Sequence, residues 1–268
     1  MSGKTMHAQP HAMVCASQAE VQAVYRRWLQ SQSPDANGTM RAVTRESVRQ
    51  AFASVLERAG RQPGLEAFVG HWQRGGRTWF WSDQHIGHAN IIRFCARPFP
   101  DAQAMDNSMQ AMACAAGIEP EDWVVFLGDV TFRDDAATRE WLASIPGSKL
   151  LVLGNHDVFE SKTLTRNPLR WGLDAVVDCL EIPVRAGLPA GIERLWLTHY
   201  PILSGLPAGV LNLHGHTHDK AGGPEGTHRN LSVEWIGYQP VELDTPGGLP
   251  SSQGDGPTIG ASTAWRGR

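Results

Sequence analysis

From Arg77 onward, short apolar runs alternate with stretches of helical periodicity. Five runs have the length of buried strands: Thr78–Trp81, Trp123–Leu127, Leu150–Leu153, Leu195–Thr198 and Val210–Leu213. Helices are predicted from Ala102 to Ala116 and from Asp134 to Ile145, with Asp134 or Asp135 as the N-cap of the second. Strands that alternate with helices predict an α/β domain with a layered sheet over residues 77–243.

The first 76 residues show a different, purely helical pattern. Ser17-Gln18-Ala19-Glu20 has the form of a capping box, and apolar residues follow it at helical spacing. Further helices are predicted around residues 48–56 and from Gly64 to Gln73, before Gly75-Gly76. Residues 1–76 are therefore expected to form a helical N-terminal extension, and whether it binds a partner or covers a cleft stays open. Residues 244–268 are rich in Gly, Pro and Ser and are expected to form a disordered tail.

Composition narrows the class of protein. The 268 residues are 41% hydrophobic, which suits one or two domains with a real core, and the formal net charge is −3. A dedicated nucleic-acid binder usually carries a basic stripe, and none is seen. Four scattered cysteines without a CxxC pair favour reduced thiols over a disulfide framework. The sequence shows neither a signal-peptide pattern nor an apolar run of membrane-spanning length, so a soluble cytoplasmic protein is expected.

Residue types that bind metal ions follow each of the five predicted strands. The segments are Ser82-Asp83-Gln84-His85, Gly128-Asp129, Gly154-Asn155-His156-Asp157, His199 and His214-Gly215-His216-Thr217-His218. In open α/β sheets, ligands bind outside the carboxyl ends of the strands, so these segments are expected to converge. Carboxylate, imidazole and amide oxygen together suit two ions of Mn²⁺, Fe or Zn²⁺. The glycines before Asp129, Asn155 and His216 allow tight turns and close backbone approach.

These five blocks, in this order, resemble the signature of calcineurin-like metallophosphoesterases. The resemblance covers residues 77–242, and the segment from Ser82 to Ile92 is similar to a bacterial and phage branch of small phosphoesterases. It implies a layered β-sandwich flanked by helices and a centre of two divalent ions, with Mn favoured, that hold a hydroxide between them.

The resemblance also implies a role for each matching residue. One ion would be held by Asp83, His85, Asp129 and His218. The other would be held by Asp129, Asn155, His199 and His216, with Asp129 as the bridge. His156 would protonate the leaving alkoxide or stabilise the transition state, because a cationic imidazole supplies both a proton and positive charge there. Asp157 would orient His156.

One block departs from the family pattern. Many members continue the Gly-Asp block with two residues and then Asp-Arg, whereas Phe132-Arg133 stand here, so only the arginine is kept. Candidates for substrate binding are His88, Arg93, Arg97 and Arg133, since arginine pairs well with phosphate oxygens. The alternative is a solvated helix face for the arginines and a satisfied hydrogen bond for His88.

Three functions are consistent with these features. The first is hydrolysis of a small phosphodiester or phosphomonoester, with a nucleotide as a candidate substrate. The second is a nuclease. The negative net charge argues against it, because binding of a long polyanion needs a basic groove. The third is a non-catalytic scaffold of the same fold, which would be marked by lost ligands.

Overall fold

The computed structural model describes residues 11–14, 63–157, 159–160, 164–185, 191–224 and 226–243. The helices predicted near residues 17–29 and 48–56 and the tail predicted at 244–268 lie outside this part and stay predictions. No helix within the described residues is long and apolar enough to cross a bilayer.

One mixed sheet contains most of the described strands. Its order is β10 (His228–Asn230), β9 (Val210–His214), β8 (Arg194–Leu197), β7 (Ala175–Pro183), β4 (Ser148–Val152), β3 (Trp123–Phe126), β2 (Thr78–Trp81) and β11 (Val241–Glu242), with β1 (His11–Val14) paired to β7. A short hairpin pairs β5 (Phe159–Glu160) with β6 (Thr165–Arg166). The five predicted runs coincide with β2, β3, β4, β8 and β9 to within two residues at each end.

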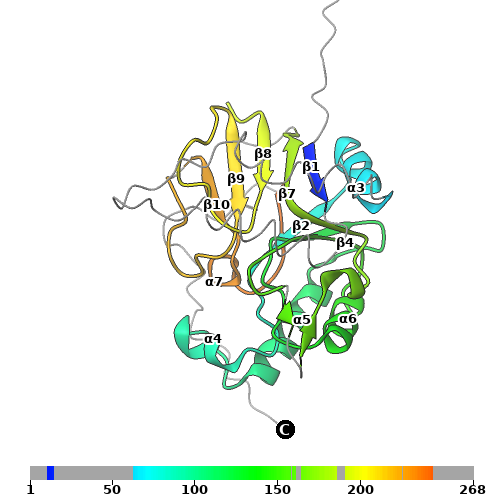
Figure 1. The fold of residues 1–268 in the computed structure, drawn as a ribbon, viewed down its shortest axis with the longest axis vertical. Coiled ribbons are helices and arrows are strands. Elements are labelled where there is room, and N and C mark those ends of the chain that lie inside the picture. The colour runs from blue at the N-terminus through cyan, green and yellow to red at the C-terminus, as the bar shows by residue number, and fades with distance from the viewer. Residues whose placement is uncertain are drawn as a thin grey trace, which may run out of the picture.

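Strand β7 joins the two halves of this sheet. Its first residues pair in parallel with β4, and its last residues pair antiparallel with β8. The sheet curls at β7, with β8, β9 and β10 on one side and β2 and β4 on the other (Figure 1). The α/β class is thus confirmed in the coarse form of a mixed, curled sheet with few helices.

The two predicted helices of this region are α5 (Ala102–Ala115) and α6 (Asp135–Ala143). Asp134 is the N-cap of α6 and accepts a hydrogen bond from the backbone N–H of Ala137. Helix α5 buries Met105, Met109 and Ala113, which recur every four residues and so lie on one face. The shorter helices are α4 (Ala89–Phe94), the 3-10 turn η1 (Pro168–Arg170) and α7 (Val233–Ile236).

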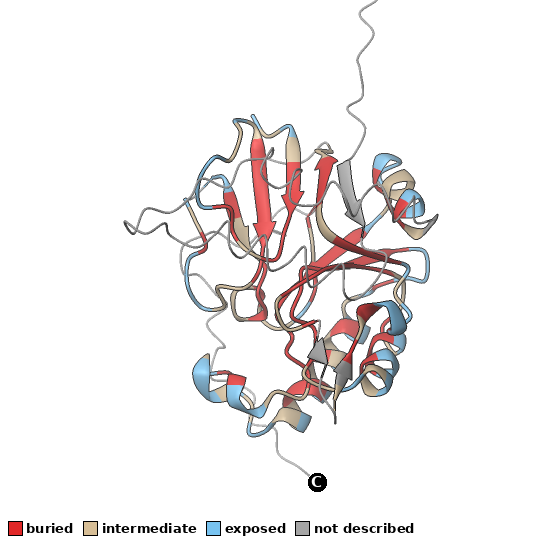
Figure 2. Ribbon diagram, viewed as in Figure 1, coloured by how far each residue is buried: buried red, intermediate tan, exposed pale blue. Residues whose placement is uncertain are grey.

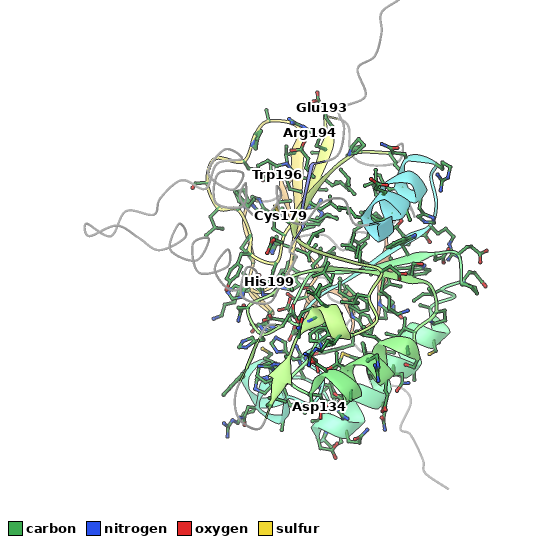
Figure 3. The ribbon with its side chains drawn as sticks, turned by 45° about the vertical axis from the view of Figure 1, so that its right-hand side comes forward. Asp134, Cys179, Glu193, Arg194, Trp196 and His199 are labelled. Carbon is green, nitrogen blue, oxygen red and sulfur yellow. The ribbon has the colours of Figure 1, made fainter. Side chains whose placement is uncertain are left out.

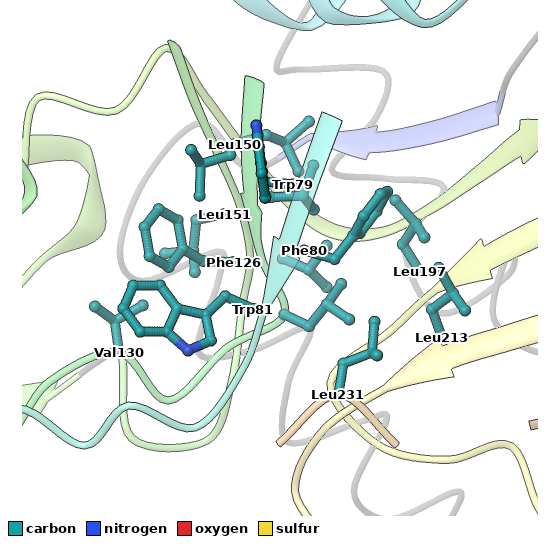
Figure 4. Packing of buried hydrophobic residues seen from close by; sticks show 14 of the residues in the cluster. Trp79, Phe80, Trp81, Phe126, Val130, Leu150, Leu151, Leu197, Leu213 and Leu231 are labelled. Atoms are coloured by element: carbon teal, nitrogen blue, oxygen red, sulfur yellow. The ribbon is translucent and has the colours of Figure 1, made fainter. Parts of the chain in front are cut away.

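The core lies on both faces of the central strands. Every residue of β2 and β3 is buried, as expected for sheet strands covered on both sides (Figure 2). Figure 4 shows Trp81 beside Phe126 on one side of β2, and Phe80 on the other side turned toward Leu197 and Leu213. The half of the sheet that holds β2 therefore packs against the half that holds β8 and β9.

Helix α3 (Pro63–Gln73) confirms the predicted helix at 64–73 but belongs to this core. Phe68 and Trp72 are fully buried in the same hydrophobic cluster as the sheet. The indole N–H of Trp72 donates to the carbonyl of Pro183 at 2.8 Å, and its ring meets Phe80 edge-on at 6.2 Å. The packed core therefore extends to α3, on the N-terminal side of the predicted boundary at residue 76, because two large side chains of that helix are buried against the strands.

The Trp72→Ala variant is expected to lose about 3–5 kcal/mol of unfolding free energy, because a large buried ring leaves a cavity and an unpaired carbonyl. Urea denaturation followed by fluorescence measures this loss. Gln73→Ala, on the exposed face of the same helix, is the matched control and should change little. Equal stability of the two variants would contradict the placement of α3 in the core.

Candidate metal centre

The five predicted ligand segments meet at the carboxyl ends of their strands. Asp83, His85 and His218 each place one ligand atom so that all three atoms lie within 4.8 Å of one another. Asp129, His199 and His216 form a second group by the same measure. Figure 3 shows how β8 reaches this region, with Arg194, Trp196 and His199 following one another toward the middle of the molecule.

The Asp129 carboxylate stands between the two groups. Its Oδ2 lies 3.7 Å from Nε2 of His85 and 3.4 Å from Nε2 of His199. Asn155 joins the second group, since its Oδ1 lies 3.1 Å from Nε2 of His199. The geometry thus brings together all seven residues predicted as ligands, with Asp129 between the two groups.

The first group has polar atoms that the protein does not satisfy. Asp83 Oδ1 and both ring nitrogens of His85 are buried, and within the described residues they have no hydrogen-bond partner. Buried polar atoms are nearly always paired, so each unpaired one needs an explanation. A divalent cation would satisfy the carboxylate oxygen and one imidazole nitrogen at once, and these donor types are its usual ligands. The residues present therefore fit a metal ion.

The carboxylates and imidazoles of the centre strongly shift one another's pKa values. Burial raises the pKa of the Asp83 and Asp129 carboxyls, but the surrounding imidazoles outweigh burial and lower both pKa values below the ordinary range. Conversely, burial opposes protonation of His199, yet the Asp129 carboxylate raises the pKa of His199 to about 9. Burial lowers the pKa of His216 to about 4. Two carboxylates that stay ionised in a buried site favour a cation between them.

Backbone strain is concentrated at the same residues. Among the described residues seven non-glycine positions have positive φ, and five of them are predicted ligands: Asp83, His85, Asp129, His216 and His218. The left-handed region costs an L-residue of order 1–3 kcal/mol, and such strain clusters at functional sites. Close approach of the backbone is confirmed as well, because a Cβ on Gly154 would collide with Asp129 and one on Gly215 with Ser82 and Asp83.

A second layer of contacts orients the ligands. Oδ2 of Asp83 accepts hydrogen bonds from the hydroxyls of Ser82 (2.7 Å) and Ser232 (3.0 Å), which leaves Oδ1 for an ion. Nδ1 of His199 lies 2.8 Å from the Leu127 carbonyl, so Nε2 faces the centre. Such partners fix the ring orientation and tautomer of ligating histidines.

Glu234 is a contact that the sequence did not reveal. Its Oε1 lies 3.1 Å from Nδ1 of His218 and also pairs with Arg97 at 2.7 Å. Glu234 belongs to the four-residue helix α7, 16 residues after His218 in the sequence. Only the fold brings it there, so no local pattern in the sequence marks it.

Asp157 accepts hydrogen bonds from three backbone N–H groups. Its Oδ2 accepts from the backbone N–H groups of Asp129 (2.9 Å) and Gly154 (2.7 Å), and its Oδ1 accepts from that of Val130 (2.8 Å). The predicted role in orienting the His156 ring stays a prediction, and the contacts shown here join the loops that carry Asp129 and Asn155. The ring of His156 faces Asp129, with Nε2 4.0 Å from Oδ2.

Two of the four candidate substrate residues are occupied elsewhere. Arg133 pairs with the buried Asp106 at 2.6 Å. The Arg97 side chain is fully buried and donates to the carbonyls of Asp83 (2.8 Å) and Gln84 (2.9 Å). Arg97 is thus a positioning residue for the first ligand loop, and its predicted contact with substrate is corrected.

The other two candidates lie at the edge of the centre. His88 stacks on Phe132 with 3.8 Å between ring centroids, and burial lowers its pKa to about 4. Arg93 is exposed on α4. Both stay predictions as substrate contacts.

The Arg97→Met variant is expected to lose about 3–5 kcal/mol of unfolding free energy, because it removes the buried guanidinium that pairs with Glu234 and leaves that carboxylate with His218 alone. Urea denaturation of the metal-free protein measures the loss, with the exposed Arg93→Met as the matched control. Adding Glu234→Gln to Arg97→Met should recover part of the loss, since it removes the orphaned charge. If the double variant were no more stable than Arg97→Met, the ion pair would not be the cause.

Fold and centre together define a mixed α/β protein with two adjoining groups of His and Asp suited to divalent metal ions. No family model matches the sequence. The chain is 30% identical over 176 residues to the uncharacterized protein MJ1445 of Methanocaldococcus jannaschii, an overlap of 61% of this chain and 85% of that protein. It is 31% identical over 171 residues to the Gene 66 protein of Mycobacterium phage D29, an overlap of 53% and 79%. The chain therefore belongs to the family of these archaeal and phage proteins.

Two solved structures are more distantly similar. The protein of unknown function AQ665 from Aquifex aeolicus has a TM-score of 0.47 and 25% identity, covering 62% of this chain and 95% of that one. The phosphopantetheinyl hydrolase PptH from Mycobacterium tuberculosis has a TM-score of 0.22 and 17% identity, covering 50% of this chain and 47% of that one. At these TM-scores the overlaps assign no activity to this chain.

Proposed function

We propose that the protein is a dinuclear metal-dependent phosphoesterase of the calcineurin-like type, acting on a small phosphodiester or phosphomonoester. The observation that carries the proposal is the pair of His/Asp groups that meet at Asp129. The strained backbone at five of these ligands supports it. The curled sheet would then correspond to the layered sandwich of that superfamily.

Two divalent ions bound there would supply an activated water and neutralise the charge of the phosphoryl group. The chain itself supplies the arrangement of ligands and a proton donor. His156 is 42% exposed, whereas the ligands His85 and His199 are 2% and 1% exposed. An incoming ester can therefore reach the His156 ring, which suits it to protonate the departing oxygen.

Metal binding tests the proposal before any substrate is known. Metal-stripped full-length protein is titrated with Mn²⁺ by calorimetry, and two ions per chain are expected. The His85→Ala variant removes a ligand of one group only and should bind about one fewer ion, while His71→Ala, whose ring contacts the Arg77 carbonyl, should still bind both. Absence of Mn²⁺, Fe²⁺ and Zn²⁺ binding would overturn the proposal.

Turnover is then measured on bis-p-nitrophenyl phosphate and p-nitrophenyl phosphate with the Mn²⁺-loaded protein. Metal-dependent hydrolysis is expected, and the preferred ester distinguishes a diesterase from a monoesterase. Two bound ions without turnover of either ester would favour the scaffold over the hydrolase.

A further inference from the structure

A row of aromatic rings leads outward from the metal centre. The ring of His85 lies 5.6 Å from that of His88, and the ring of His88 lies 6.5 Å from that of Phe94. His88 is held in place by Phe132, whose ring is parallel to it within 9°. Phe132 in turn lies 4.7 Å from the ring of His156. The row therefore begins at a ligand and at the proposed proton donor and ends at Phe94.

Phe94 is the exposed end of this row. It is 65% exposed, the largest value among the large hydrophobic residues of the described chain. Most large apolar side chains here are buried, and water contact with a phenyl ring is unfavourable. A single exposed ring is ordinary on a protein surface, but this one continues a line of rings that starts at the centre.

The backbone that carries Phe94 is anchored on both sides of the residue. Helix α4 begins four residues after the ligand His85, and its residue Ile91 is buried in the core. Just beyond the helix, the Arg97 backbone N–H donates to the Ile92 carbonyl at 2.8 Å, and the Arg97 side chain is bound to the Asp83 loop. Because this backbone is already ordered, binding of a ligand to the ring costs only the freedom of the Phe94 side chain.

The chemistry around the Phe94 ring indicates which kind of ligand group would pack against it. Rings favour other rings in offset-stacked or edge-to-face contact, an advantage that a saturated group of equal size does not have. The Arg93 guanidinium lies over the ring of Phe94, 5.5 Å from its centroid, so a cation–π contact already engages the ring and the stacking partner would approach beside it. The metal centre, at the other end of the row, would hold the phosphate. Together these features fit one molecule with a phosphate at one end and a planar ring at the other.

We propose that Phe94, backed by His88 and Phe132, stacks against a planar aromatic or heteroaromatic group carried by the phosphate-ester substrate. The inference rests on the proposed function and extends it from phosphate esters in general to esters with a flat ring a few bonds from phosphorus. Phe94 would then determine substrate specificity. The segment between Gly87 and Arg97, which contains no predicted metal ligand, would take part in substrate binding.

Two non-hydrolysable anions test the stacking surface without requiring turnover. 4-Phenylbutylphosphonate and 4-cyclohexylbutylphosphonate have the same charge, spacer and ring size, and differ in the planarity of the ring. Their Kd values are measured by calorimetry on the full-length, Mn²⁺-loaded protein, on Phe94→Leu and on Phe94→Tyr. Leu169→Ala, at another exposed apolar position, is the control.

The wild-type protein is expected to prefer the phenyl compound by roughly fivefold. Phe94→Leu should remove that preference, and Phe94→Tyr and Leu169→Ala should keep it. Binding of both compounds with equal affinity in the wild-type protein would overturn the stacking surface while leaving the phosphate-binding centre intact. A preference that survives in Phe94→Leu would assign the ring contact to another residue. If neither compound binds while the Mn²⁺-loaded protein hydrolyses a nitrophenyl ester, the stacking surface fails and the phosphoesterase proposal stands; if that hydrolysis is absent as well, both fail.

Discussion

The Asp129→Asn variant is expected to lose metal-dependent ester hydrolysis altogether while it still folds. Oδ2 of Asp129 faces His85 and His199 from the two groups at once, so this carboxylate is the ligand that both ions would share. Asparagine has the same size and keeps one carbonyl oxygen. It removes the negative charge, however, and places an N–H₂ donor or a neutral oxygen where two cations would need a carboxylate.

The variant should fold because the contacts that hold the loop lie mostly in the backbone. The Asp129 N–H donates to Asp157, and its Oδ1 accepts from the His156 N–H, a bond that the asparagine oxygen can also accept. Calorimetry should show at most one bound Mn²⁺, and circular dichroism should be unchanged. Asp134→Asn is the matched control, because the same chemical change occurs five residues away at a helix N-cap where Asn serves as well as Asp. Metal-dependent turnover retained in Asp129→Asn would refute the bridging assignment.

Those parts of the fold that have a local cause could be predicted from the sequence. Strands β2, β3 and β4 are short, continuous apolar runs because both of their faces are buried. Helix α6 begins where Asp134 supplies a cap. Its buried residues Thr138, Trp141 and Leu142 stand at positions i, i+3 and i+4, the spacing of one helix face.

Strand β7 was missed for a physical reason. Its nine residues, AVVDCLEIP, are interrupted by Asp178 and Glu181, so that no clean apolar run or alternation stands out. The interruption reflects two different environments, because the strand pairs with β4 at one end and with β8 at the other. Glu181 accepts the indole N–H of Trp196 at 2.8 Å, a partner that lies in another strand. Such long-range pairing leaves no local trace.

The candidate site, like the fold, could be predicted from the sequence only in part. Ligand residue types directly after strands could be identified, because a metal centre needs particular atoms and strand ends bring them together. The contacts around the ligands could not be assigned, since Arg97, Asp157 and Glu234 act through carbonyls, backbone N–H groups and a distant imidazole. An arginine near a predicted phosphate site resembles a substrate contact in sequence, and only burial reveals that Arg97 stabilises the loop instead.

The His156→Ala variant should lower turnover by about 10²–10⁴-fold on esters with poor leaving groups, the contribution typical of a positioned general acid. The ring can play that part because it is partly exposed and its Nε2 lies 4.0 Å from the carboxylate that both ligand groups face. Burial lowers the pKa of His156, although the Asp129 carboxylate opposes that shift. A lower pKa makes the protonated ring a stronger acid but leaves a smaller fraction of it protonated at neutral pH.

Dependence on the leaving group separates this role from a structural one. Phenoxide is a poor leaving group, so methyl phenyl phosphate needs a proton on the departing oxygen. The p-nitrophenoxide of methyl p-nitrophenyl phosphate leaves readily without one. The loss in His156→Ala should therefore be much larger for the phenyl ester. Calorimetry should still find two Mn²⁺ ions, because His156 is outside both ligand groups, and this result distinguishes the variant from His85→Ala. An equal loss on both esters would mean that His156 stabilises charge or positions the substrate rather than donating the proton.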